Sequence, residues 1–311
     1  MSRSSILNEI KGFWKRSTAT EKLFYAALVV ILLFVLHHAT KKPDPEGFET
    51  SNEFIVKRGS GIYDPFYVDV YDTLLYDSVR NDYEIGRLVE KTTPTKKSVI
   101  ADIGCGTGHT VGKLTTHNID IVGIDISPAM ISKAKSLYPD ANFRQGDALK
   151  AMLFPQGSLT HITCLYFTVY MINDKRQFFR NCMNWLMPGG YLVLHLVDRE
   201  KFSPVVQVGE VLVGVDPQAY AEKRITTTRA EFDNYSYKAK FDIKGDDALF
   251  TEVFKAKPSG GVRQNEHNLF MPSQAKVLSM AKDAGFIMIS ESEMKKCGYH
   301  NQFIYVLSKP M

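Results

Sequence analysis

Glycines and an aspartate at the ends of two apolar segments form the pattern that most directly indicates chemistry. Gly104, Gly106 and Gly108 follow the first segment, and Asp125 ends the second. Glycines without a Cβ let the backbone approach a ligand closely. An ionised carboxylate at the end of the next strand can accept hydrogen bonds from both hydroxyls of a ribose. The pattern predicts a site for a nucleotide-like cofactor at the carboxyl edge of an α/β sheet.

The glycine spacing argues against a dinucleotide cofactor. A dinucleotide-binding turn has the pattern G-x-G-x-x-G/A, and the last position of that pattern falls on His109. An NAD-dependent reductase, one alternative for this chain, would need glycine or alanine there.

Alternating strand and helix patterns surround these residues. We expect strands at 98–102, 120–125, 142–144, 159–166, 191–197, 286–289 and 302–307. Helices are predicted at 108–115, 127–138, 174–186 and 273–284. Two segments depart from this alternation: residues 61–97 have aromatic side chains at helical spacing, and residues 199–266 contain short alternating runs typical of antiparallel strands. We expect one domain over 61–311, with a helical lid at 61–97 and a β-rich insertion at 199–266.

An apolar run near the start of the chain predicts a membrane anchor. The uncharged stretch 23–40 would form a helix about 27 Å long, enough for a thin bilayer core. A buried core helix fits less well because the run precedes the domain and is hydrophobic on all sides. A cleaved signal peptide would need a shorter leading segment and a better cleavage site. We expect a tail with a single transmembrane helix at 1–40 and a polar linker at 41–60.

The net charge of +4 is concentrated beside this run. Residues 1–42 contain seven basic and two acidic residues, so the rest of the chain is nearly neutral. A nearly neutral body does not indicate a nucleic-acid partner. The four cysteines form no C-x-x-C pair, so we predict neither a metal site nor a disulfide framework.

Five motifs, in order, resemble the class I S-adenosylmethionine-dependent methyltransferase family. They are VIADIGCGTG at 99–108, VGID at 122–125, QGDA at 145–148, MPGGYLVL at 187–194 and AKDAGF at 281–286. The resemblance covers residues 63–311. It implies a Rossmann-like, doubly wound sheet of seven strands with the last strand antiparallel, and S-adenosylmethionine as the cofactor. The implied reaction is methyl transfer by in-line displacement.

The resemblance also implies roles for individual positions. Asp102 would lie near the amino-acid part of the cofactor, Asp125 at the ribose, Ile126 against the adenine, and Asp147 with Ala148 at the adenine amino edge. The full set of predicted cofactor residues is Tyr71, Asp102, Gly104, Cys105, Gly106, Gly108, Asp125, Ile126, Asp147 and Ala148.

A proton acceptor is needed only if the acceptor atom arrives protonated. The candidate catalytic residues are His267, Tyr170 and His195. The family often has an acidic residue at the start of the fourth strand, whereas this chain reads Leu159-Thr160-His161-Ile162 there. A base therefore cannot be carried over from the family at that position.

These observations predict a methyltransferase bound to a membrane by one span and acting on a small or lipid-like molecule. The catalytic domain is expected in the cytosol, where S-adenosylmethionine is made. An anchor would raise the local concentration of a membrane-dissolved acceptor. Two alternatives stay open: a methyltransferase for a membrane-associated protein, and a non-catalytic scaffold that binds S-adenosylmethionine.

Overall fold

The computed structural model describes residues 54–206, 221–257 and 259–311, and five isolated positions: Thr18, Glu21, Lys22, Tyr25 and Gln218. The chain divides into two units, 1–46 and 47–311, and nearly all described residues belong to the second. Apart from the isolated positions at 18–25, the predicted anchor lies outside the described residues, as does most of the predicted linker. Within the part that is described, no helix has the length and apolar character needed to cross a bilayer.

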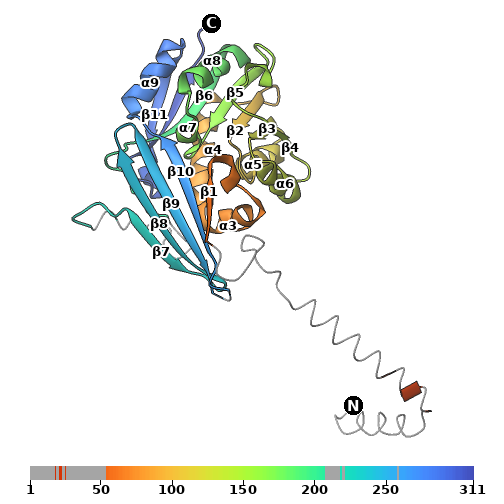
Figure 1. Cartoon of the computed structure of the whole chain (residues 1–311). Helices are drawn as coiled ribbons and strands as arrows, with labels where there is room; N and C mark the ends of the chain where they lie inside the picture. Colours follow the sequence, from red (N-terminus) through yellow and green to blue (C-terminus); the bar gives the residue numbers. More distant parts are fainter. Residues whose placement is uncertain are drawn as a thin grey trace. The chain divides into compact units, whose positions relative to one another are not determined.

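A seven-stranded sheet in the order β11-β12-β6-β5-β2-β3-β4 forms the centre of the second unit (Figure 1). Its strands are β2 (Val99–Ile103), β3 (Asp120–Asp125), β4 (Asn142–Gln145), β5 (Leu159–Cys164), β6 (Leu186–Val197), β11 (Ile287–Glu293) and β12 (Gln302–Ser308). Strands β2 to β6 pair in parallel, and β12 runs antiparallel to β6. The predicted seven-stranded sheet with an antiparallel last strand is confirmed.

Helices cover both faces of this sheet. One face carries α4 (Ser78–Thr92), α5 (His109–Thr116) and α6 (Pro128–Leu137), and the other carries α8 (Lys175–Trp185) and α9 (Gln274–Asp283). Neighbouring residues of a strand point to opposite faces. Ile100 therefore packs in the core beneath α4, α5 and α6, and Ala101 in the core beneath α8 and α9. The short α7 (Thr168–Met171) follows β5. Strand β6 begins at Leu186, before the predicted start at Tyr191. Its pairing with β5 has a register irregularity that accommodates the Pro-Gly-Gly segment.

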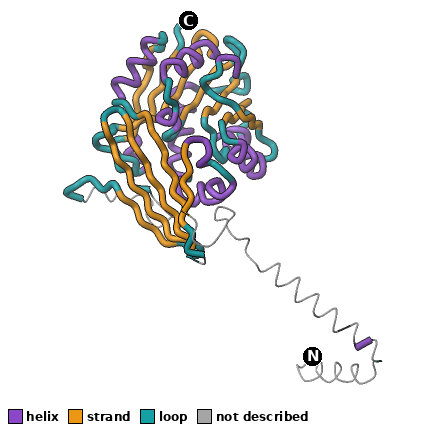
Figure 2. Tube along the Cα trace, viewed as in Figure 1, coloured by secondary structure: helices purple, strands orange, loops and turns teal. Residues whose placement is uncertain are grey.

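A second sheet of five strands, in the order β1-β10-β9-β8-β7, forms long hairpins beside the helices (Figure 2). Its strands are β1 (Phe54–Arg58), β7 (Thr227–Glu231), β8 (Tyr235–Lys244), β9 (Asp247–Ala256) and β10 (Val262–Phe270). The last four are antiparallel, as their alternating sequence predicts. Strand β1 pairs in parallel with β10, although it lies inside the predicted linker 41–60. The linker prediction was wrong over these residues. Their partner strand lies far away in the sequence, so local sequence patterns do not reveal the pairing.

Helix α3 (Pro65–Leu75), in the predicted lid, is attached to the second sheet by an ion pair. The Asp64 carboxylate accepts from the Tyr67 N–H at the helix start at 3.1 Å. Its Oδ1 and Oδ2 also accept from the Arg263 guanidinium of β10, at 2.9 and 2.8 Å. Arg263 is fully buried and also donates to the Ile62 carbonyl at 2.9 Å. Tyr67 packs edge-on against Phe254 of β9. These contacts fix the position of α3.

We expect the substitution Arg263→Met to lower the free energy of unfolding by about 3 kcal/mol, since it removes one partner of a largely buried pair. Arg58→Met is the matched control, because Arg58 pairs with Glu266 at the exposed edge of the same sheet. The control should change stability by less than about 1 kcal/mol. Urea unfolding measures both variants, and equal losses would contradict the role given to Arg263.

Candidate active site

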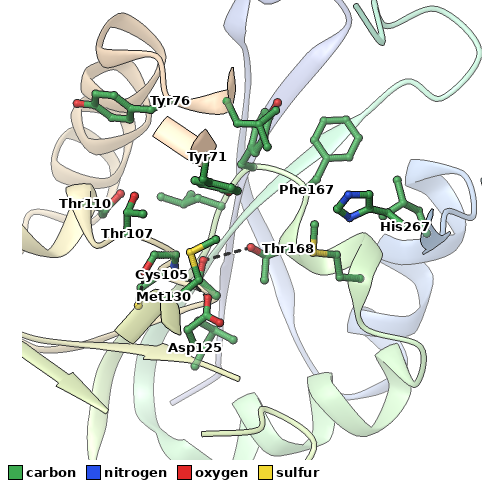
Figure 3. Close-up of a pocket in the computed structure, with 18 of the residues that line it drawn as sticks. Tyr71, Tyr76, Cys105, Thr107, Thr110, Asp125, Met130, Phe167, Thr168 and His267 are labelled. Carbon is green, nitrogen blue, oxygen red and sulfur yellow. Dashed lines mark hydrogen bonds between the residues drawn. The ribbon is translucent and has the colours of Figure 1, made fainter. Parts of the chain in front are cut away.

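A cavity of about 510 Å³ lies at the carboxyl ends of β2, β3 and β5. Its volume is within the range of about 300–1,000 Å³ that is usual for small-molecule sites. The glycine turn and Asp125 line one end, and Phe250 and His267 of the second sheet line the other. Figure 3 shows Tyr71 on one side of this space and His267 with Phe167 on another. Three separate elements, the main sheet, α3 and the second sheet, therefore contribute to one cavity.

Backbone donors of two turns hold the Asp125 carboxylate. The Gly106 N–H donates to Oδ2 at 3.0 Å, and the Ser127 N–H donates to Oδ1 at 2.8 Å. Burial raises the pKa of Asp125, and these backbone hydrogen bonds counteract the rise. Each oxygen keeps a lone pair for a further donor. The carboxylate is thus fixed in place and still able to accept from a ligand.

Gly106 is the residue of the glycine turn whose missing Cβ leaves space in the cavity. Its φ is +54°, and a Cβ there would lie 3.7 Å from the Tyr71 ring, between the turn and α3. A Cβ on Gly104 would instead lie 2.3 Å from the Thr168 side chain. Gly108 does not line the cavity, contrary to its prediction as a cofactor residue. A Cβ there would meet an aromatic ring of β4 at 2.6 Å, so this glycine allows close packing of α5.

The other predicted cofactor residues all line the cavity: Tyr71, Asp102, Gly104, Cys105, Gly106, Asp125, Ile126, Asp147 and Ala148. Asp102 is buried and accepts a hydrogen bond from the Thr163 hydroxyl at 2.6 Å. The parallel register of β2 and β5 places these two residues side by side. Burial raises the pKa of Asp102 to about 7.

Asp72 of α3 and Tyr76, the residue that follows α3, contact the glycine turn and the first residue of α5. The Asp72 Oδ1 accepts from the Thr107 hydroxyl at 2.6 Å, and its Oδ2 lies 3.1 Å from His109 Nε2. Tyr76 stacks on the His109 ring with a centroid distance of 3.6 Å. The position that breaks the dinucleotide glycine pattern is therefore occupied by a side chain that holds the lid in place above the turn.

Arg80 is a cavity residue that sequence reasoning missed. It is buried on α4, and its guanidinium lies 3.8 Å from the centroid of the Tyr166 ring and donates to the Leu75 carbonyl at 3.0 Å. Across the described residues, no Asp or Glu oxygen lies within 4.0 Å of it, and its buried Nε has no hydrogen-bond partner. A buried guanidinium without an acidic partner can bind an anionic group of a ligand. Nothing in an ordinary amphipathic helix marks such a residue in the sequence.

Aromatic rings surround the end of the cavity beside the second sheet. We call this end the aromatic lobe, formed by Tyr63, Tyr67, Phe167, Phe202, Phe241, Phe250 and His267. The His267 Nε2 lies 2.7 Å from the carboxylate of Glu252, which is fully buried and also accepts from the Tyr237 hydroxyl at 2.7 Å. Burial alone would raise the pKa of Glu252, but its hydrogen bonds, led by that from His267, hold the pKa below its ordinary value.

The other two predicted catalytic residues lie outside the cavity lining, and both predictions were wrong. The Tyr170 hydroxyl is fully buried and accepts from a backbone N–H of β6 at 2.9 Å. His195 is fully buried in β6 between Glu84 and Gln302, at 2.8 and 2.9 Å. Each side chain satisfies buried partners and cannot contact a ligand. In the described part of the chain, no group of three or more His, Cys, Asp or Glu side chains is arranged to hold a metal ion.

Comparisons with known sequences identify the same core. Residues 101–194 match the family model described as a methyltransferase domain. The chain is 30% identical over 143 residues to the dTDP-4-amino-2,3,4,6-tetradeoxy-D-glucose N,N-dimethyltransferase of Saccharopolyspora spinosa, covering 43% of this chain and 56% of that enzyme. It is 34% identical over 101 residues to a trans-aconitate 2-methyltransferase of Escherichia coli O1:K1, covering 32% and 39% of the two. The chain thus spans about half, or less, of the length of these curated relatives.

Solved structures show the same fold. An S-adenosylmethionine-dependent methyltransferase from Clostridium acetobutylicum has a TM-score of 0.61 at 15% identity, covering 79% of this chain and 98% of that one. CalS10 of Micromonospora echinaspora, an amino pentose methyltransferase solved with bound S-adenosylmethionine, has a TM-score of 0.54 at 17% identity, covering 78% and 96%. The described domain is therefore similar to S-adenosylmethionine-dependent methyltransferases, in sequence over residues 101–194 and in fold over most of its length.

Proposed function

We propose that this chain transfers the methyl group of S-adenosylmethionine to an amine of a small molecule that enters the aromatic lobe. The observation that carries the proposal is the continuity of one cavity from the glycine turn to His267. Two relatives named as N,N-dimethyltransferases of amino sugars support an amine as the acceptor. The apolar lobe also suits the small or lipid-like acceptor that the sequence predicts.

The residues of the cavity fit the cofactor. Because Gly106 has no Cβ, no side chain of the glycine turn fills the cavity beneath Tyr71. Asp125 would accept from the ribose hydroxyls, Arg80 would hold the carboxylate, and Asp102 would face the ammonium group. Ile126, Asp147 and Ala148 would contact the adenine. When bound, S-adenosylmethionine supplies an electrophilic methyl group on its sulfonium.

The chain's own contribution to the reaction is alignment, exclusion of water and removal of one proton. The aromatic lobe excludes water and orients the acceptor. An ammonium group must lose a proton before its nitrogen can act as a nucleophile. Because His267 Nε2 contacts Glu252, its Nδ1 is the nitrogen left to accept that proton, and the carboxylate stabilises the resulting imidazolium.

Methyl-labelled S-adenosylmethionine distinguishes this proposal from its alternatives. The full chain is incubated with the label and with small-molecule, lipid and protein fractions of a cell extract. Label in a small molecule or lipid supports the proposal. Label only in protein would favour a protein methyltransferase. Cofactor binding without label in any fraction would favour a non-catalytic scaffold and contradict the proposal.

We also propose that residues 1–40 anchor the protein in a membrane by one span, with 41–53 leading to a cytosolic catalytic domain. The uncharged run 23–40 supports the span, and the synthesis of S-adenosylmethionine in the cytosol supports a cytosolic catalytic domain. The full chain should stay in the membrane pellet after carbonate extraction, and a variant lacking residues 1–42 should stay in the supernatant. Membrane retention of the shortened variant would contradict the single anchor.

Cofactor binding should release a proton from Asp102 near neutral pH. Burial raises the pKa of this carboxyl to about 7, so below that pH it is largely protonated in the free protein. A bound ammonium group would favour the carboxylate and lower its pKa again. At about pH 6 we expect the calorimetric enthalpy of binding to depend on the ionisation enthalpy of the buffer, and above about pH 8.5 much less. Asp102→Asn should remove this dependence, and an unchanged dependence in the variant would contradict the assignment.

Arg80→Gln should weaken binding of the aminocarboxylate part of the cofactor and leave binding of the nucleoside part nearly unchanged. We expect it to weaken binding of S-adenosylhomocysteine at least tenfold, about 1.4 kcal/mol, because a charge-assisted contact to the carboxylate is lost. Binding of 5′-methylthioadenosine, which lacks the aminocarboxylate, should change less than about twofold. Arg87→Gln, on the same helix but paired with Glu90, is the control. Equal weakening of both ligands by Arg80→Gln would place Arg80 away from the carboxylate.

A further inference from the structure

The rings of the aromatic lobe pack against one another and line one cavity. The His267 centroid lies 5.3 Å from that of Phe250, 5.8 Å from Tyr67 and 6.0 Å from Tyr63. Phe241 continues the wall, 5.9 Å from Phe250. The face of an aromatic ring carries negative charge density and attracts a cation within about 6 Å of its centroid. Such a wall favours a positively charged group over a neutral one of the same shape.

A negatively charged side chain, that of Glu252, lies behind this wall. Glu252 is fully buried next to His267, and hydrogen bonds hold its pKa low, so it is ionised at neutral pH. Arg80 lies at the cofactor end of the cavity, over Tyr166. Arg224 stacks behind Phe202 at 4.9 Å and lines a different cavity. The wall of the aromatic lobe therefore has the buried Glu252 carboxylate in contact with its His267 ring.

Within the part of the chain that the structure describes, no Lys or Arg side chain lines the aromatic lobe. Recognition of a diphosphate needs Lys or Arg side chains, or several backbone N–H groups, pointing at its oxygens. Among the described lining residues, Arg80 is the sole Lys or Arg, and it belongs to the cofactor end. A phosphate group in the aromatic lobe would thus meet aromatic rings and a buried carboxylate.

We propose that the aromatic lobe binds a cationic amine carried on an apolar, phosphate-free body, so that the acceptor is not a nucleotide-linked sugar. This inference rests on the proposed function and names its substrate class. The ammonium enters the cavity beside these rings and gives one proton to His267 Nδ1. Its nitrogen then forms the new N–C bond as the C–S bond of the sulfonium breaks, which leaves a thioether and a methylated ammonium.

A pair of isosteres tests the preference for a cation. Benzyltrimethylammonium and neopentylbenzene have the same shape and differ in charge. Each is titrated by calorimetry into the full chain saturated with S-adenosylhomocysteine. We expect the cation to bind at least tenfold more tightly, while dTDP at millimolar concentration does not displace it. Equal affinities, tighter binding of the neutral isostere, displacement by dTDP, or binding of neither isostere would overturn the proposal.

Two variants locate the source of the preference. Glu252→Gln should weaken binding of the cation at least fivefold and leave the neutral isostere within about twofold. Phe250→Leu should do the same through loss of one ring face, without a change to the buried hydrogen bonds. Glu266→Gln is the matched control on the surface of β10 and should change neither affinity. If both test variants keep the wild-type preference, the assigned residues are wrong and the proposal falls. Failure of the proposed function would appear separately, as no binding of S-adenosylhomocysteine at the outset.

Discussion

The attachment of helix α3 at both of its ends is the constraint on which the cavity depends. At its start, Asp64 pairs with the buried Arg263 of the second sheet. Towards its end, Asp72 binds Thr107 and His109 beside the glycine turn. The helix therefore ties the second sheet to the main sheet of the same unit. The glycine turn and the aromatic lobe line one cavity in this arrangement.

Local patterns predict most of the main sheet and the cofactor end. The strand ending at Asp125 and the glycines before α5 depend on short-range periodicity and turn chemistry, which a sequence displays directly. Features that depend on distant pairing are not predictable in this way. Strand β1 finds its partner in β10, and Arg80 becomes a cavity residue because Tyr166 and the end of α3 enclose it.

The two histidines predicted as catalytic residues also show what local sequence patterns do not reveal. His195 and His267 both lie on strands with alternating or apolar neighbours, and the sequence gives no reason to separate them. The fold does: β6 is covered on both faces and buries His195 between polar partners, whereas β10 exposes the His267 ring to the cavity and holds it with Glu252. Burial and register, rather than residue type, decide which histidine can contact a ligand.

A crystal structure of the full chain with S-adenosylhomocysteine would test the central claim most directly. We expect the ribose hydroxyls on Asp125, the homocysteine carboxylate on Arg80, and the sulfur facing the open space of the aromatic lobe. A ligand bound in the reverse direction, or a sulfur separated from the aromatic lobe by protein atoms, would contradict a methyl transfer in this cavity.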